Sequence, residues 1–358
     1  MQIVEIVKAI NLNADLLILD EPTSSLTIKE TEILFTNLRK FRDRGVTIIF
    51  ISHRLEEVFE IIDRISVLRD GRYLGTFEAS RITPKEVVTL IAGKELLKEL
   101  EHRQSSEECA CPEVVLAAKN LSRGKYFRNI DFELFQGEIL GFYGLQGSGR
   151  TEIMETIFGM YKPESGEIYI KGKPVTIESP GDAIHKGLAL IPEDRRRAGI
   201  FQNMDVKDNI AIIHKRGISK FSFMQKSKVF AIAAEYARKL SIKITGISQM
   251  VRQLSGGNQQ KVIISRCLST KPSILLMDEP TRGIDVGTKA EIFKILRKLK
   301  TEENLSIIIV SSELQEVVAE CDRVIVMFNG QISGTLTGTD ITKEKVLQYA
   351  FSGSANQI

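Results

Sequence analysis

A glycine-rich loop that ends in a hydroxyl side chain is the first feature of this sequence that could do chemistry. The segment 144–151 reads Gly-Leu-Gln-Gly-Ser-Gly-Arg-Thr; it follows an apolar run at 139–143 and precedes a segment, 152–158, that can form a helix. Strand, loop and helix in this order can bind phosphate, because backbone N–H groups and the positive end of the helix surround its oxygens. The residues predicted to bind nucleotide phosphates are Gly144, Gln146, Gly147, Ser148, Gly149, Arg150, Thr151 and Glu152.

Two residues of this loop decide its chemistry. The Thr151 hydroxyl can bind Mg²⁺ beside the phosphates. Arg150 stands where such loops have lysine, and its planar guanidinium is too large to take the place of an ammonium group between the β- and γ-phosphates. We therefore predict that phosphate binding persists while hydrolysis is impaired. A glycine-rich turn without a ligand is the alternative interpretation.

A pair of carboxylates forms the second candidate. Asp278 and Glu279 follow the apolar run 274–277, which is typical of a buried strand, so both lie at the strand end where open α/β sheets bind ligands. Asp278 is predicted to hold Mg²⁺ through water, and Glu279 to polarise the attacking water as general base. An acidic turn that caps the next helix is the alternative, which the recurrence of Asp-Glu-Pro-Thr at 20–23 weakens.

A serine followed by two glycines opens another predicted helix. Ser255 has the position of an N-cap, and the residues at 262–267 have the spacing of one buried helix face. Glycines beside the cap leave the helix N-terminus bare, so that it can approach an anion. An ordinary capped helix is the alternative, and it does not explain the two glycines. The predicted anion-facing segment comprises Leu254, Ser255, Gly256, Gly257, Asn258 and Gln259.

The elements that must position these groups belong to an α/β fold. Short β-branched runs at 47–51 and 306–310 alternate with helical patterns at 29–41 and 289–299, and this alternation predicts a parallel sheet. At 358 residues, the chain exceeds what one hydrophobic core usually supports, so we expect two cores.

The sequence also contains an internal repeat. The segment 17–23 (Leu-Ile-Leu-Asp-Glu-Pro-Thr) returns at 275–281 as Leu-Leu-Met-Asp-Glu-Pro-Thr. After one inserted residue, 49–53 (Ile-Phe-Ile-Ser-His) aligns with 308–312 (Ile-Ile-Val-Ser-Ser). Matching segments at a fixed separation indicate two copies of one structural unit.

The repeat predicts how the chain is divided. Read backwards, Gln2 aligns with Gln260, so the sequence before 259 has no first copy and we expect an N-terminally truncated chain. A charged stretch that ends in proline separates the copies and has the composition of a linker. The expected parts are the C-terminal portion of a first domain at 1–96, a linker at 97–112, a complete second domain at 113–350 and a tail at 351–358.

Composition excludes other classes of protein. A net charge of +3 is too small to suggest a nucleic-acid partner, and every apolar run is shorter than the roughly 18 residues that span a membrane. No signal-peptide pattern opens the chain, so a cytosolic protein is expected. Cys109, Cys111 and His102 could be imagined as metal ligands, but they lack a fourth, and a solvated linker is the better interpretation.

Taken together, the motifs resemble those of a known family. The phosphate loop, Leu-Ser-Gly-Gly-Asn-Gln-Gln-Lys and Ile-Leu-Leu-Met-Asp-Glu-Pro-Thr, in this order, are similar to an ABC transporter ATPase domain, a P-loop NTPase. More narrowly, 147–152, 192–195 and 278–287 resemble the second half of the tandem ATPase subunits of ribose, galactose, xylose and arabinose importers. The segment 50–59 resembles the end of the first half, so one partial and one complete copy are expected.

This resemblance implies ATP and Mg²⁺ as cofactors and hydrolysis coupled to sugar import. In such subunits the halves face each other, and each ATP lies between the phosphate loop of one half and the glycine-rich helix, the signature, of the other. By this resemblance, Asp20 and Glu21 match the first half's Mg²⁺ ligand and catalytic base, and His53 matches its switch histidine. Glu193 stands where many such domains have a Mg²⁺-sensing glutamine, and Asp285 matches the loop that crosses the dimer seam.

The sequence departs from the pattern at two positions. Ser312 replaces histidine at the second switch position and Arg150 replaces lysine, so the second half's own site resembles a degenerate one. Tyr126 or Phe127 could stack on adenine, although a core position is the alternative.

The resemblance also implies partners. These are transmembrane permease subunits, a sugar-binding protein reached through the permease, and a second ATPase chain or the missing N-terminal half, with the chain peripheral at the cytoplasmic face of the membrane. Two other functions stay open: a nucleotide-binding but non-hydrolysing structural or regulatory protein, and a soluble ABC protein of translation or DNA repair. The last is disfavoured because the coiled-coil insertion and long basic linker of such proteins are absent from this sequence.

Overall fold

The structure, a computed structural model, describes residues 14–20, 22–23, 28–52, 58–69, 72–83, 86–87, 90, 113–145, 147–214, 219–220 and 223–352. Contacts divide the chain into two compact units, residues 1–105 with 285–290 and residues 106–284 with 291–358. The predicted linker at 97–112 and three predicted site residues, Glu21, His53 and Gln146, lie outside the described residues.

The larger unit is built on a six-stranded sheet in the order β10-β13-β14-β7-β15-β16. All neighbours run parallel except β15 and β16, which form an antiparallel hairpin. The predicted parallel sheet is therefore confirmed. The strands are β7 (Ile139–Gly144), β10 (Leu188–Ile191), β13 (Ile274–Asp278), β14 (Ser306–Val310), β15 (Arg323–Phe328) and β16 (Gln331–Thr337).

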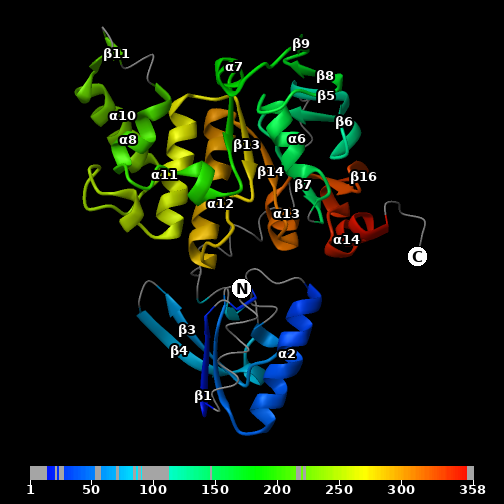
Figure 1. Ribbon diagram of the computed structural model, residues 1–358, viewed down its shortest axis with the longest axis vertical. Coiled ribbons are helices and arrows are strands. Elements are labelled where there is room, and N and C mark those ends of the chain that lie inside the picture. The colour runs from blue at the N-terminus through cyan, green and yellow to red at the C-terminus, as the bar shows by residue number, and fades with distance from the viewer. Residues whose placement is uncertain are drawn as a thin grey trace. The chain divides into compact units, whose positions relative to one another are not determined.

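Side chains of the central strands alternate between two cores. On β13, Leu275 and Met277 belong to one core, whereas Ile274 and Leu276 belong to the other. Every residue of β13 and β14 is buried, as expected for parallel strands covered on both faces. Figure 1 shows α11 and α12 on one side of these strands and α6 with the antiparallel strands on the other.

The second layer is an antiparallel sheet in the order β6-β5-β8-β9. Its strands are β5 (Val114–Arg123), β6 (Phe127–Phe135), β8 (Ser165–Ile170) and β9 (Lys173–Val175). The helices described in the larger unit are α6 (Arg150–Ile157), α7 (Pro180–His185), α8 (Val206–Ala211), α10 (Lys226–Lys239), α11 (Gly256–Ser269), α12 (Val286–Glu303), α13 (Leu314–Glu320) and α14 (Lys343–Ser352); residues 286–290 of α12 are grouped with the smaller unit. Shorter elements are the π-helix η3 (Arg195–Gly199), the 3₁₀ turns η4 (Ile212–His214), η5 (Val251–Gln253) and η6 (Gly338–Asp340), and the hairpin of β11 (Ser219–Lys220) with β12 (Phe223–Met224).

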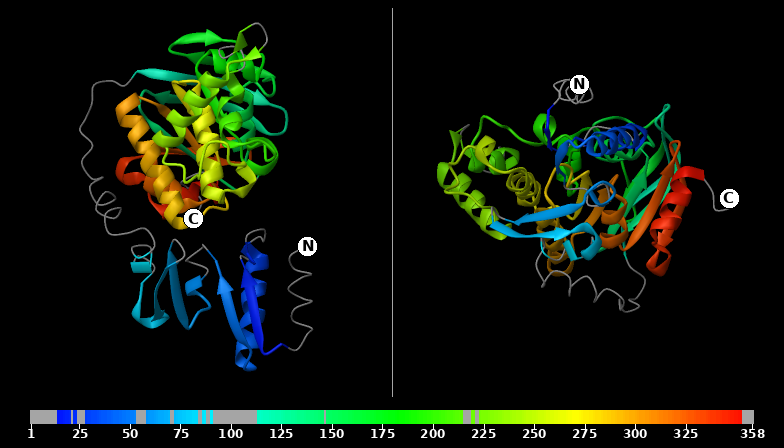
Figure 2. Two further views of the ribbon diagram at one scale, coloured as in Figure 1. Left: turned by 90° about the vertical axis from the view of Figure 1, so that its left-hand side faces the viewer. Right: turned by 90° about the horizontal axis from the view of Figure 1, so that it is seen from below.

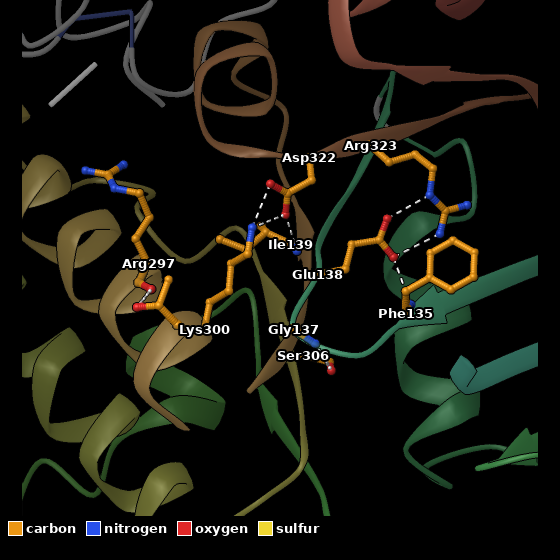
Figure 3. A network of polar contacts seen from close by, with 10 residues as sticks. Phe135, Gly137, Glu138, Ile139, Arg297, Lys300, Ser306, Asp322 and Arg323 are labelled. Atoms are coloured by element: carbon orange, nitrogen blue, oxygen red, sulfur yellow. Dashed lines mark hydrogen bonds and ion pairs between the residues drawn. The ribbon is translucent and has the colours of Figure 1, made fainter. Parts of the chain in front are cut away.

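A polar network fixes the amino ends of β7 and β15 (Figure 3). The Asp322 carboxylate accepts the Ile139 N–H at 2.7 Å and the Lys300 ammonium at 2.7 Å. Arg323 donates to both oxygens of Glu138, at 2.7 and 3.0 Å, and Glu138 also accepts the last backbone N–H of β6 at 2.9 Å. The network therefore joins the two layers at the end of the sheet opposite the phosphate loop.

The described residues of the smaller unit form a parallel pair of strands, a hairpin and a long helix. β1 (Leu16–Asp20) pairs with β2 (Thr47–Ile51) in parallel, and β3 (Arg64–Arg69) pairs with β4 (Arg72–Glu78) in antiparallel fashion; α2 (Ile28–Asp43) and η1 (Ala79–Arg81) are also described. The helix packs along the strands (Figure 2). One buried cluster of this unit comprises Leu17, Leu19, Leu34, Phe35, Leu38 and Ile61. A second comprises Val67, Ile82 and Val87.

One face of the β1–β2 pair is exposed. The side chains that alternate with its core residues are large and apolar, and a run of them is accessible to solvent: Leu16 (47%), Ile18 (60%), Ile49 (46%) and Ile51 (49%). This face contrasts with the fully buried strands of the larger unit. Within the described residues, no helix has the length and apolarity needed to cross a membrane.

Candidate functional site

The phosphate loop lies between β7 and α6, as predicted. Gly149 is the N-cap of α6 and has a left-handed φ of 96°. A Cβ on Gly149 would lie 2.6 Å from the Tyr126 carbonyl oxygen, and one on Gly144 would lie 2.6 Å from the Met327 carbonyl oxygen. Only glycine fits at either position, so the bare backbone needed to approach a phosphate is built into the loop.

The Tyr126 carbonyl oxygen also requires glycine at a second position. A Cβ on Gly330, in the turn between β15 and β16, would lie 2.6 Å from the same oxygen. The Gly330 carbonyl oxygen accepts the Arg128 N–H at 2.8 Å. The β15–β16 turn is therefore packed against the chain segment that packs against the phosphate loop.

Two polar atoms, one in the loop and one at the end of β13, are buried without a hydrogen-bond partner among the described residues: Ser148 Oγ and Asp278 Oδ1. Burial raises the pKa of Asp278 to about 7, although a hydrogen bond from the Thr151 side chain opposes the shift. Burying an oxygen without a hydrogen-bond partner costs free energy, so a ligand or ion that binds the oxygen would recover part of that cost.

The residues present fit a divalent cation. Asp278 and Thr151 supply a carboxylate and a hydroxyl, the hard oxygen ligands that Mg²⁺ prefers. No group of three or more His, Cys, Asp or Glu in the described part of the chain could hold a metal ion. A cation at this position would therefore take its other ligands from phosphate and water, as Mg²⁺ in nucleotide sites does.

The predicted general base is held by the residue that replaces lysine. Arg150 Nη1 lies 3.8 Å from Glu279 Oε1 and donates to the Ser311 carbonyl oxygen at 2.8 Å. Ser312 Oγ donates to Glu279 Oε2 at 3.1 Å. Burial raises the pKa of Glu279, and the charge of Arg150 opposes this shift.

This arrangement adds a second reason why hydrolysis should be slow. The sequence predicted that Arg150 would fit the phosphates poorly because of its size. The structure shows in addition that both oxygens of Glu279 are occupied, one by a cation and one by a hydroxyl. A carboxylate whose two oxygens already have partners is less available to accept a hydrogen bond from the attacking water. Residue types at separate positions in the sequence gave no signal of this contact.

Glu193 lies at the start of the loop that leads into η3. It forms an ion pair with Arg282, and both side chains are largely exposed. Its negative charge contributes to the raised pKa values of Asp278 and Glu279, so it lies near both carboxylates. The sequence did not predict the Arg282 contact.

Ser255 caps α11, which confirms the predicted N-cap. Its Oγ accepts the Asn258 side-chain N–H at 2.9 Å, and the Asn258 side-chain oxygen accepts the Lys243 N–H at 2.8 Å. A Cβ on Gly256 would lie 3.0 Å from Arg195 Nη2. The side chains of the signature segment therefore hold its backbone, and the glycine lets a guanidinium lie against it.

The remaining predicted residues lie on other segments of the chain. No hydrogen bond or ion pair joins residues 254–259 to residues 144–152 in the part of the chain that the structure describes. Asp285 accepts the Thr288 N–H at 2.9 Å at the start of α12. Asp20 ends β1 in the smaller unit, as Asp278 ends β13 in the larger one.

The two aromatic candidates differ in exposure. Phe127 is buried in the core between the two layers, which confirms the alternative interpretation for that residue. Tyr126 is 39% exposed and its carbonyl packs against the phosphate loop. Of these two aromatic residues, Tyr126 is therefore the one that can present its ring to a ligand.

Comparison with known proteins places these motifs in a family. Residues 127–282 match the family described as ABC transporter. The chain is 43% identical over 355 residues to the ribose import ATP-binding protein RbsA of Clostridium tetani, covering 99% of this chain and 69% of that protein. It is 42% identical over 352 residues to the protein of the same description from Shouchella clausii, covering 98% and 70%.

A solved structure shares the fold. The nucleotide-free ATP-binding cassette of an ABC transporter aligns with a TM-score of 0.58, covering 65% of this chain and 95% of that one. The sequence identity of 23% supports the fold alone.

Proposed function

Since the chain belongs to the family of ABC transporter ATP-binding proteins, we propose that it is the ATP-binding, energy-coupling subunit of a sugar importer. The observation that carries the proposal is one site: a bare phosphate loop with Asp278 and Glu279 at the neighbouring strand end, in a chain similar along its length to ribose import proteins. The nucleotide phosphates bind at the loop, and the adenine stacks on Tyr126.

Mg²⁺ would be held by Asp278 and Thr151, where it would neutralise phosphate charge. The loop backbone orients the phosphates, and Asp278 accepts the Thr151 hydroxyl. Glu279 is the general base for the attacking water, and its pairing with Arg150 and Ser312 keeps turnover slow. Glu193, which forms an ion pair with Arg282, senses the filled site and transmits it.

We also propose that residues 1–96 are a partial copy of the same domain. The repeat in sequence and the matching order of strand, helix, strand and hairpin support it. In this proposal Asp20, Glu21 and His53 belong to a second nucleotide site, while Ser255, Gly256, Gly257 and Asp285 belong to surfaces that face another ATPase half. The partners are permease subunits, a sugar-binding protein acting through them, and another ATPase half. The chain is then peripheral at the cytoplasmic face of the membrane.

Titration calorimetry with MgATP tests nucleotide binding. We expect binding of modest affinity, and we expect Gly149→Asp to abolish it because a Cβ at this position would lie 2.6 Å from the Tyr126 carbonyl oxygen and would distort the loop. Gly246→Asp is the matched control, since a Cβ on Gly246 would meet no atom within 4 Å. Absence of heat at millimolar ATP would contradict the proposal.

A second function, nucleotide binding without hydrolysis in a regulatory role, is favoured by the Arg150–Glu279 pair. Steady-state ATPase assays separate the two. Slow turnover that Glu279→Gln abolishes supports the importer subunit, and undetectable turnover with intact binding supports the regulator. Co-purification of a permease from membranes tests the transport partner independently.

A further inference from the structure

Arg123 is held between two tyrosine rings. Its guanidinium carbon lies 4.8 Å from the Tyr126 ring centroid and 3.8 Å from the Tyr161 ring centroid. Both distances are within the roughly 6 Å at which a cation is attracted to an aromatic face. Arg123 ends β5, Tyr126 follows in the turn before β6, and Tyr161 follows α6, so three separate segments meet at this cation.

This cluster borders the phosphate loop. The Tyr126 carbonyl oxygen packs against Gly149, the N-cap of α6. Glu155, in the second turn of α6, senses the charge of Arg123, which lowers its pKa against the larger opposing effect of burial. A nucleotide with its phosphates on the loop would therefore have its base close to the cluster.

Both rings remain accessible, whereas one nitrogen of the cation is buried. Tyr126 and Tyr161 are 39% and 46% exposed, whereas Arg123 Nη1 is buried and has no hydrogen-bond partner among the described residues. Lys125 lies 5.7 Å from the Tyr126 centroid, but its side chain is exposed and can move aside. A buried guanidinium nitrogen without a partner costs stability, so stacking, rather than hydrogen bonding, holds Arg123 in place.

We propose that Arg123 is a positioning residue that fixes Tyr126 as a platform for the nucleotide base, with Tyr161 holding Arg123 from the other side. The proposal rests on the proposed nucleotide function, and it assigns the contribution that the base makes to nucleotide affinity. A ring fixed in advance loses less conformational freedom when a base stacks on it than a ring that is free to rotate. Arg123 therefore strengthens binding of nucleosides with phosphates and has no effect on phosphates alone.

Two ligands separate these contributions in the full-length chain. We would measure dissociation constants for a non-hydrolysable MgATP analogue and for Mg-tripolyphosphate, which binds the loop but has no base. Arg123→Leu should weaken the ATP analogue about 5-fold, corresponding to one cation–π contact, and leave tripolyphosphate within about 2-fold. Tyr161→Leu should produce the same selective loss from the opposite side of the cation.

Lys119→Leu is the matched control. Lys119 also lies on β5 and stacks on a tyrosine, Tyr169, at 4.9 Å, so its loss should change neither constant. Equal weakening of both ligands by Arg123→Leu and Tyr161→Leu, or unchanged ATP affinity in both variants, would overturn the proposal. A wild-type chain that binds tripolyphosphate and ATP equally would overturn the base platform while leaving the phosphate loop intact. If it binds neither ligand, the proposed nucleotide function itself fails.

Discussion

The smaller unit and the corresponding part of the larger unit have the same local structure but different surroundings. β1 and β2 correspond to β13 and β14, α2 to α12, and the β3–β4 hairpin to β15–β16. Even an irregularity is repeated: the register shifts between Val67 and Leu68 in one hairpin and between Val326 and Met327 in the other. Local sequence is therefore sufficient to specify these elements and their pairing.

Burial differs most between the two copies on one face. Leu17 and Leu19 are buried, as are their counterparts Leu275 and Met277. Ile18 is exposed, whereas its counterpart Leu276 is completely buried under α6 and the antiparallel layer. The comparison shows that strand formation and strand burial are separately determined here, because the described smaller unit has the strands and one covering helix without a second layer.

The largest difference should appear when the counterparts are truncated. Leu276→Ala removes a fully buried side chain and should lower the free energy of unfolding of the larger unit by about 2–5 kcal/mol. Ile18→Ala should change that of the smaller unit by less than about 0.5 kcal/mol, because the side chain is already in solvent. Hydrogen exchange resolved by peptide measures both in one sample. A comparable loss at Ile18 would mean that its face is covered in solution.

A second pair of counterparts is Arg323, which belongs to the polar network, and Arg64 in the smaller unit. Arg323→Ala leaves the nearly buried Glu138 without its ion-pair partner, and we expect a loss of about 2 kcal/mol, less than for a fully buried pair. Its counterpart Arg64 has no ion-pair partner in the described part of the chain, so Arg64→Ala should be close to neutral. Urea unfolding of the intact chain, followed by hydrogen exchange, distinguishes them. A neutral Arg323→Ala would contradict the idea that this network joins the layers.

The aspartates at the two strand ends, Asp278 and Asp20, should differ in their effect on ATP affinity, and this effect is smaller than the stability effects above. Asp278→Asn should weaken ATP binding about tenfold in the presence of Mg²⁺ and far less in EDTA, because one metal ligand loses its charge. Asp20→Asn should leave the affinity of the loop at 144–151 unchanged. Calorimetry with and without Mg²⁺ tests both. If Asp278→Asn weakens binding equally in EDTA, Asp278 acts on the loop and not on a cation.

The smallest effect should come from the exposed apolar face itself. Replacing Ile18 and Ile49 together with threonine keeps β-branched side chains but removes apolar surface, so stability should stay within about 0.5 kcal/mol. Fluorescence of the apolar dye ANS should fall, since such dyes report contiguous exposed apolar surface. The control is Ile33→Thr, an exposed isoleucine on α2. An equal decrease in the control would show that the dye does not recognise the β1–β2 face.

Sequence patterns predicted much of the site, because spacing fixes backbone geometry. The phosphate loop, the carboxylates after β13 and the Ser255 cap all have the expected local structure. Helices were predicted with boundaries that differ by up to four residues; α12, for example, begins at Val286 rather than Lys289 and ends at Glu303 rather than Leu299. The tail is predicted to begin at 351, and the last described helix, α14, ends at Ser352.

Side-chain contacts between distant segments could not be predicted. Arg150 and Glu279 come from different strand ends, as do Glu193 and Arg282, and only the folded sheet brings each pair together. The proposed roles of Glu21, His53 and Gln146 stay predictions, since these residues lie outside the described part of the chain.

The turn at Gly330 has a consequence for how this chain can change. Surface hairpin turns usually accept insertions and substitutions without harm. Here a Cβ at Gly330 would meet the Tyr126 carbonyl oxygen, as a Cβ at Gly149 would. A side chain or an added residue at the turn would therefore displace the Tyr126 segment toward the phosphate loop. In a library of variants selected for nucleotide binding, substitutions at Gly330 should therefore be as rare as substitutions at Gly149. A fusion tag inserted at this turn would inhibit nucleotide binding at the loop.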